Sequence, residues 1–246
     1  MRNIWTIAKR EYQLYFSSPA AYLIAFAILL FLGILFFLTI QVATQAQFVP
    51  TVDRITSPLA FLLFLATPVV TFNLLAGEHR MGTIELLLTA PVRDWELVVG
   101  KWLGAFLFML SILFVTIIYP LIMHQMVDPG IDQGPFVSGY LGLMLLCAAL
   151  VALGVMISSF FNNPIAAFIA TLGVLIFFWW FIGIIAQVTG PTSGAYEFVN
   201  YMNLNDHFYS NLTRGVIDLR DITFFLSLTA LSLFLGTVAV EMRRWR

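Results

Sequence analysis

The sequence predicts an all-α integral membrane protein: six transmembrane helices, an amphipathic helix before the first span, and a short cytoplasmic helix between the second and third spans. Two observations support this fold class. Of the 246 residues, 61% are hydrophobic and 10% are charged, and the mean hydropathy is +0.94. Soluble globular domains are about 45–50% apolar and about 25% charged, so most of this surface must face lipid. The chain also contains six long apolar runs without Asp, Glu, Lys or Arg.

Each apolar run is long enough to cross a bilayer, because a spanning helix needs about 20 mostly apolar residues. We expect the spans at roughly 20–40, 57–76, 102–123, 136–160, 164–188 and 222–240. Residues 1–246 then form a single transmembrane domain, and residues 189–221 are its longest outer segment. The net charge of −1 gives no basic footprint for nucleic acid.

Lysine and arginine residues gather at one side of the predicted bundle, and such residues favour the cytoplasmic side. The side that carries the N-terminus holds Arg2, Lys9, Arg10, Arg80, Arg93, Lys101, Arg243, Arg244 and Arg246. The other side holds only Arg54, Arg214 and Arg220. We therefore expect a multi-pass protein of the cytoplasmic membrane with both termini in the cytoplasm.

Residues 2–16 are predicted to form an amphipathic helix at the membrane interface. At about 100° per residue, Trp5 and other apolar side chains fill one arc, while Lys9 and Arg10 lie on the opposite arc. Tryptophan, tyrosine and basic residues on such a helix suit the headgroup region. Glu11 breaks the pattern, which leaves two interpretations. The helix is a general interface anchor, or Glu11 faces a protein partner or the basic segment before the third span.

The charged segment 77–101 predicts a short helix at residues 83–90 on the cytoplasmic face. Thr83 is a suitable N-cap, Glu85 stands in the first turn, and Pro91 ends the helix. Asp94 is then the expected cap of the third span. The segment is either a solvated connection or a peg that docks in a groove of a cytosolic protein, with leucines supplying the buried area.

Two motifs resemble those of a known family. The first is Gly82-Thr83-Ile84-Glu85-Leu86-Leu87-Leu88-Thr89-Ala90-Pro91, with Glu78 before it and Gly100-Lys101 after it. It resembles the E-x-x-x-G-T-x-E-x-L-L-x-x-P signature and following G-K pair of type 2 ABC transporter permeases of the exporter class. The second is Asp206-His207-Phe208 followed by the stretch R-G-V-I-D-L-R-D that begins at Arg214. It is similar to the short permeases associated with gliding motility and nitrous-oxide reductase maturation.

The resemblance implies that residues 83–90 are the coupling helix on a separate cytosolic ATPase, and that residues 2–16 are the interface helix. ATP and Mg would bind to that partner, and a second permease copy, identical or similar, would complete the transporter. The coupling residues carried over are Glu78, Arg80, Gly82, Thr83, Glu85, Leu86, Leu87, Leu88, Pro91 and Lys101; those of the interface helix are Trp5, Lys9, Arg10 and Glu11. Spans two and five would line the pathway, with Thr67, Pro68, Asn73 and Thr171 as candidates. Residues 41–56 are only a short loop, which argues against the drug-efflux branch that carries a folded domain there.

Missing motifs argue against several other functions. The chain has no G-x-x-x-x-G-K-[ST] phosphate loop, so we expect it to bind no cofactor and the ATPase to be another polypeptide. No carboxylate lies inside a predicted span, which argues against an ion-coupled transporter. His79, His124 and His207 are spread over both sides, so we expect surface or interface histidines and no metal site, and no catalytic constellation is visible.

In the outer segment we expect Asp206 to cap a short helix that ends at Gly215, and Asp221 to cap the sixth span. The candidate outer residues are Asp206, His207, Phe208, Arg214, Gly215 and Asp218. The predicted function is the permease subunit of an ATP-driven exporter in the lipid bilayer. One alternative is a non-transporting component that transmits ATPase motion to an outer-face accessory protein. Another is an ion-coupled secondary transporter.

Overall fold

The computed structural model describes residues 2–46, 49–82, 93–128, 130–189 and 194–244, and within these ranges it contains helices and no β-strand. The all-α prediction is therefore confirmed. The helices are α1 (Arg2–Ser17), α2 (Pro19–Ala46), α3 (Asp53–Thr71), α4 (Ala76–Met81), α6 (Asp94–Thr116), α7 (Ile118–Met126), α8 (Gln133–Phe160), α9 (Pro164–Ile176), the π-helix η1 (Phe177–Phe181), α10 (Ile182–Thr189), α11 (Gly194–Tyr201), α12 (Leu204–Tyr209), the 3-10 turn η2 (Leu212–Arg214) and α13 (Leu219–Arg244).

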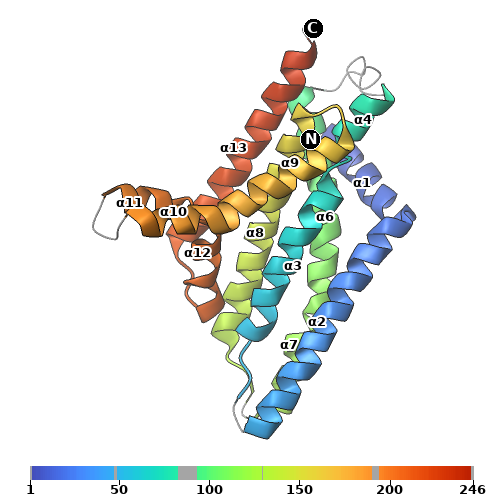
Figure 1. Cartoon of the computed structure of the whole chain (residues 1–246). Helices are drawn as coiled ribbons and strands as arrows, with labels where there is room; N and C mark the ends of the chain where they lie inside the picture. The colour runs from blue at the N-terminus through green and yellow to red at the C-terminus, as the bar shows by residue number, and fades with distance from the viewer. Residues whose placement is uncertain (1, 47–48, 83–92, 129, 190–193, 245–246) are drawn as a thin grey trace.

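Among the described residues, six helical stretches are long and apolar enough to cross a membrane. They comprise α2, α3 with α4, α6 with α7, α8, α9 with η1 and α10, and most of α13. Figure 1 shows that α4, α1 and the C-terminal end of α13 lie toward the same end of the bundle. The chain is thus a multi-pass membrane protein.

Helix α8 forms the centre of the bundle and packs against α3, α6, α9 and α13 (Figure 1). Small residues on α8 let its neighbours approach closely. A Cβ added at Gly142 would lie 2.9 Å from the Leu212 side chain, and one at Gly139 would lie 3.1 Å from that of Thr56. By contrast, only 11% of the first span is buried, so α2 presents most of its apolar surface to the surroundings.

The second span is interrupted between α3 and α4. Helix α3 continues through Pro68, whose carbonyl accepts a hydrogen bond from the Phe72 amide at 3.0 Å, and the helix ends at Thr71. Ser158 on α8 forms hydrogen bonds with the unwound backbone between α3 and α4. Its Oγ accepts from the amides of Leu75 (3.2 Å) and Ala76 (3.1 Å) and donates to the Phe72 carbonyl (3.1 Å). The interruption of the helix is tolerated because protein groups satisfy these backbone groups.

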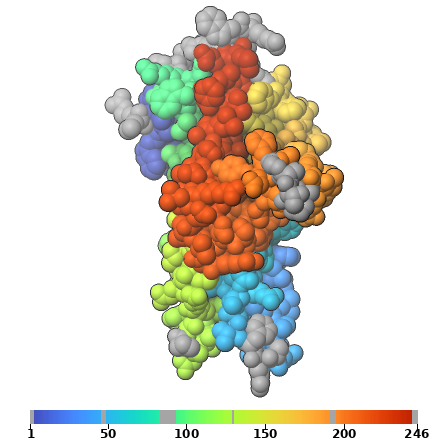
Figure 2. Space-filling model, turned by 90° about the vertical axis from the view of Figure 1, so that its left-hand side faces the viewer, coloured from blue at the N-terminus to red at the C-terminus, as the bar shows by residue number. Residues whose placement is uncertain are grey.

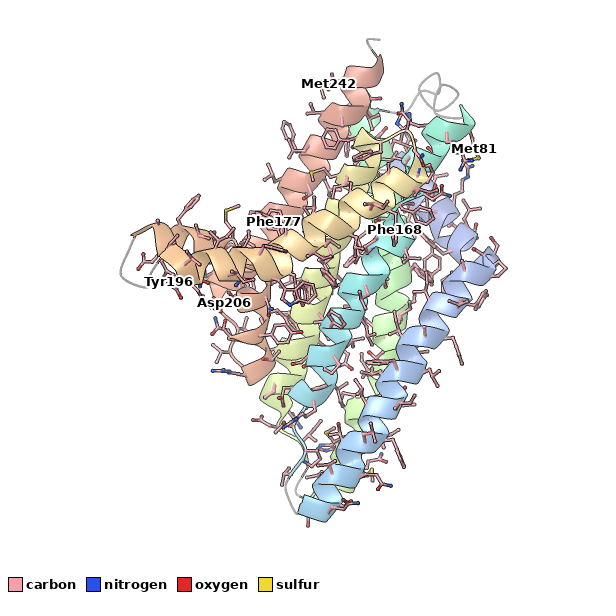
Figure 3. The ribbon with its side chains drawn as sticks, viewed as in Figure 1. Met81, Phe168, Phe177, Tyr196, Asp206 and Met242 are labelled. Carbon is pink, nitrogen blue, oxygen red and sulfur yellow. The ribbon has the colours of Figure 1, made fainter. Side chains whose placement is uncertain are left out.

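The fifth span bends away from the bundle and leads into the outer segment. Figure 1 shows α10 and α11 side by side, projecting from the flank of the bundle, and Figure 3 places Tyr196 and Asp206 there, far from Met81. In Figure 2 the outer segment and the start of α13 cover the middle of one face.

Two cap predictions in the outer segment are wrong. Asn203, not Asp206, caps α12: its side-chain oxygen accepts a hydrogen bond from the Asn205 amide at 3.1 Å. Asp218, not Asp221, caps α13, because its Oδ1 accepts from the Arg220 amide at 2.9 Å. Gly215 does end η2, with a left-handed φ of +94° that favours glycine.

Candidate functional site

A buried lysine connects three helices at the end of the bundle that carries α1 and α4. Lys101 on α6 places its Nζ 2.8 Å from Glu11 Oε1 on α1 and 2.7 Å from Glu78 Oε1 on α4. The exposed fraction of the Lys101 side chain is 3%, and those of Glu11 and Glu78 are 12% and 16%. We call these three residues the Lys101 clasp. It answers the question that Glu11 raised, since this carboxylate faces the charged segment.

Two glycines allow α1 to reach the clasp. A Cβ at Gly100 would lie 2.8 Å from the Ile7 Cβ, and one at Gly104 would lie 2.6 Å from the Glu11 Cβ. Helix α1 therefore packs closely on α6 at these two glycines, as small-xxx-small spacing permits. Because α1 lies so close to α6, the Glu11 carboxylate can reach the Lys101 ammonium directly.

Glu96 forms hydrogen bonds at the N-terminal ends of both α6 and α1. Its Oε2 accepts from the Arg93 amide at 3.1 Å and from the Asn3 side-chain amide at 3.1 Å. Arg93 is thus the N-cap of α6, with an extended φ of −77° and ψ of 146°, and Asp94 is the first helical residue. The expectation that Asp94 caps this helix was wrong, because the helix begins at Asp94 itself, one residue earlier than expected, and Glu96 supplies the acceptor.

Tyr15 joins α1 to the second span. Its hydroxyl donates to the Val70 carbonyl at 2.7 Å, and its ring stacks on Phe108 with centroids 4.7 Å apart. Burial raises the pKa of the Tyr15 phenol above its ordinary value, so the hydroxyl remains a donor. The interface helix is therefore fixed to α3 and α6 as well as to the clasp.

Helix α4 leads from the clasp to the predicted coupling helix. It ends at Met81 and is capped by Gly82, whose φ is +68°, and Arg80 on its last turn is exposed. The remaining predicted coupling residues lie outside the described residues: Thr83, Glu85, Leu86, Leu87, Leu88 and Pro91. The chain enters this connection through α4 and leaves it through α6, and Glu78 and Lys101 join the two helices directly.

The profile of a family described as ABC-2 family transporter protein matches residues 5–240, from the interface helix to the end of the last span. The chain belongs to the ABC-2 family of transporter proteins. This ABC-2 protein is also 36% identical over 110 residues to "Probable ABC transporter permease protein NosY" of Pseudomonas aeruginosa. That alignment covers 42% of this chain and 39% of the relative, so it spans well under half of either protein. The resemblance to type 2 ABC permeases is confirmed, and the chain is a membrane-spanning ABC transporter component.

The candidate pathway residues of the ABC-2 protein lie in different surroundings. Thr67 and Thr171 are both 0% exposed, and the Thr67 hydroxyl donates to the Leu63 carbonyl at 2.7 Å. Pro68 is buried within α3. Only Asn73 is exposed, and it lines a cavity of about 760 Å³ that also borders Lys101. Within one chain, the other three residues therefore contribute to helix packing.

The outer segment of the ABC-2 protein contains a buried polar group that sequence reasoning missed. His207 is 5% exposed, so the expectation of a surface or interface histidine was wrong. Its Nδ1 lies 2.6 Å from Asp221 Oδ1, its Nε2 lies 2.8 Å from the Tyr201 carbonyl, and its ring stacks on Phe224 at 4.0 Å. Asp221 turns inward to this histidine and also accepts from the Asn211 side chain at 3.0 Å. These contacts attach the outer segment to α13.

The other predicted outer residues do not share one site. Phe208 is 0% exposed and lies in the core, whereas Arg214 and Asp218 are exposed. Asp206 is exposed and accepts a hydrogen bond from the Asn200 side chain at 2.9 Å. The segment thus packs on the flank of the bundle, and its exposed surface carries both polar side chains and apolar ones such as Phe198 and Val216.

Proposed function

We propose that this chain is the permease subunit of an ATP-driven exporter, in which a separate cytosolic ATPase binds ATP and Mg. Family membership and six apolar spans support the role of a membrane component. The excess of Lys and Arg at the end carrying α1 and α4 supports a cytoplasmic location for that end in the cytoplasmic membrane. The ATPase then docks on the connection between α4 and α6, and the substrate leaves through the opposite side.

The Lys101 clasp is the observation that carries the coupling proposal. A force applied between Gly82 and Arg93 enters the bundle through α4 and α6. Since Lys101 is bonded to both Glu78 and Glu11, a displacement of either helix moves α1 as well. ATP binding in the partner would thereby bias the whole cytoplasmic end of the bundle between two arrangements.

A second permease copy would complete the transporter. In the single chain, only 11% of the first span and 22% of the fifth are buried, so both present wide apolar faces. A two-fold related copy, identical or similar, would cover part of these faces and lipid the remainder. The pathway would then lie between the copies, beside α3 and α9, where the candidate lining residues stand.

The test reconstitutes the permease with its ATPase in proteoliposomes and measures ATPase binding and stimulated ATP hydrolysis separately. Leu87→Asp and Glu85→Lys should lose binding, because they alter the docking segment. The triple variant of Lys101→Met, Glu11→Gln and Glu78→Gln, which removes the clasp without leaving an uncompensated charge, should keep binding but lose most stimulation. Arg54→Gln, which removes an exposed cation at the opposite end of the bundle, is the matched control. Full binding and stimulation by both docking variants would refute the coupling segment, and full stimulation by the triple variant would refute the clasp.

A second candidate function is transmission of ATPase motion to an outer-face protein without transport. The contacts of His207 and Asp221 favour it, because they fix the outer segment to α13 and allow motion of the bundle to reach the outer surface. Capture of an outer-face protein by the wild type but not by Asp221→Ala, with no transport defect on deletion of the gene, would support this function over export. Activity driven by a proton gradient without any ATPase would establish the ion-coupled alternative.

A further inference from the structure

A long apolar groove runs between α6 and α8 and meets α1 at one end. Its volume is about 1180 Å³. Trp5, Lys9 and Gln13 of α1 stand at one end, and Phe114 of α6 with Val137 and Met144 of α8 lines the walls. The wall side chains are exposed: 77% for Phe114, 56% for Val137 and 39% for Met144. The groove is therefore accessible from the surface of the bundle.

The hydroxyl groups along the groove are satisfied within the protein. The Tyr12 hydroxyl lies 3.0 Å from Ser111 Oγ, and the Tyr140 hydroxyl donates to the Thr116 carbonyl at 3.0 Å. These hydroxyl groups already have hydrogen-bond partners, and the remaining wall residues are aliphatic or aromatic. A polar solute would lose its hydration without compensation there, whereas an acyl chain would lose none. The wall of the groove selects a hydrocarbon ligand.

The end of the groove at α1 has the opposite character. Among the described residues that line the groove, Lys9 is the only one with a charge. No acidic side chain in the described part of the chain forms an ion pair with Lys9, because Glu11, two residues on, is bonded to Lys101 instead. Trp5, 59% exposed, stands beside it. Tryptophan and lysine on an interfacial helix lie at headgroup level, where a cation attracts anionic lipids.

We propose that this groove is a binding site for one anionic phospholipid, with the headgroup phosphate at Lys9 and an acyl chain between α6 and α8. A cation that has no ion pair with any described residue stands at the end of an apolar groove, and these two features match the two parts of such a lipid. This site does not depend on the proposed coupling mechanism. One basic side chain near an anionic headgroup corresponds to about a fivefold preference over a zwitterionic lipid.

The experiment measures lipid binding to the purified full chain by native mass spectrometry, with phosphatidylglycerol and phosphatidylcholine titrated in parallel. The wild type should bind one phosphatidylglycerol per chain about fivefold more tightly than phosphatidylcholine. Lys9→Gln should abolish this preference. Arg10→Gln is the matched control, because it makes the same charge change one residue along α1. The Arg10 side chain lines the cavity beside Asn73 and Lys101 instead of the groove. This variant should retain the preference.

A second pair of variants tests the groove itself. Met144→Trp places a bulky ring in the groove and should weaken lipid binding, whereas Leu30→Trp, at an exposed position of α2 outside the groove, should not. An unchanged preference in Lys9→Gln, or an equal loss in Arg10→Gln, would overturn the proposal by showing general surface attraction. Disulfide-linked dimers of Met144→Cys that carry no lipid would also overturn it, because a second chain would then occupy the groove.

Discussion

Replacing Lys101 with methionine should destabilise the protein strongly, because it removes the cation from between two carboxylates that are largely buried. Glu11 and Glu78 are only 12% and 16% exposed, and each has one oxygen within 2.8 Å of the ammonium. Without Lys101, both charges would remain in a poorly solvated site beside each other. Methionine retains most of the length and apolar character of the lysine stem, so packing changes little.

The magnitude follows from two opposing effects. At the distances of 2.8 and 2.7 Å, each pair attracts by about 6 kcal/mol at an effective dielectric constant of about 20. Desolvation opposes this by several kcal/mol per ion, so the intact clasp adds little net stability. Removal of the shared partner abolishes the attraction but leaves the desolvation of both carboxylates. We therefore expect a loss of about 3–5 kcal/mol in the free energy of unfolding.

The assay is reversible unfolding in mixed micelles at neutral pH, with the denaturing detergent as the variable and helical circular dichroism as the signal. The comparison is a triple variant, Lys101→Met with Glu11→Gln and Glu78→Gln, which carries no charge at the site. It should recover half or more of the lost stability, because the two uncompensated charges are gone. A Lys101→Met protein within about 1 kcal/mol of the wild type would refute the reasoning. So would a triple variant as unstable as the single one.

Three further predictions concern the packing of the bundle. Gly100→Leu should lower the free energy of unfolding by about 1–3 kcal/mol, since its Cβ would lie 2.8 Å from that of Ile7, whereas Gly173→Leu has no atom within 4 Å and should be near neutral by the same unfolding assay. Ser158→Ala should leave two buried amides of the second span without acceptors, at about 1–3 kcal/mol for each, and should accelerate their hydrogen exchange. Burial raises the pKa of Tyr209 to about 12 from an ordinary value near 10, so the folded state holds this proton more tightly than the unfolded state. Wild-type stability should hold below pH 10 and fall as pH rises from 10 to 12, a fall that Tyr209→Phe should reduce; equal slopes for both proteins would contradict this.

The mistaken cap residues show where local patterns are insufficient. Asp94, Asp206 and Asp221 are all good N-cap types, and each stands one to three residues after the residue that caps the helix. Where a helix begins depends on which neighbours compete for the same side chains. Asp221 instead contacts His207, which lies 14 residues earlier on a different helix, α12.

The candidate site was predicted in its parts but not in its arrangement. Glu11 stood out as the one acidic residue in an apolar arc, and Glu78 and Lys101 belong to the motif of the charged segment. Nothing in the local sequence pairs Glu11 with Lys101, because 90 positions separate them. Gly100 was noted as part of the Gly-Lys pair of the motif, and only the packing shows that Gly100 and Gly104 let α1 approach α6.

The sequence by itself determined that this protein lies in lipid, which fold class it has and to which family it belongs. Long uncharged apolar runs lie in lipid, where a helix satisfies the backbone hydrogen bonds within the segment. In residues 2–16 the apolar side chains recur at the helical period, so one face of that helix suits the membrane interface. Tertiary structure alone decided which charges meet, where the second span unwinds, and which side chain satisfies that break. The physical reason is that solvent exposure and helical period act within a few turns of chain, whereas a buried ion pair or a serine at a helix break requires residues brought together by folding.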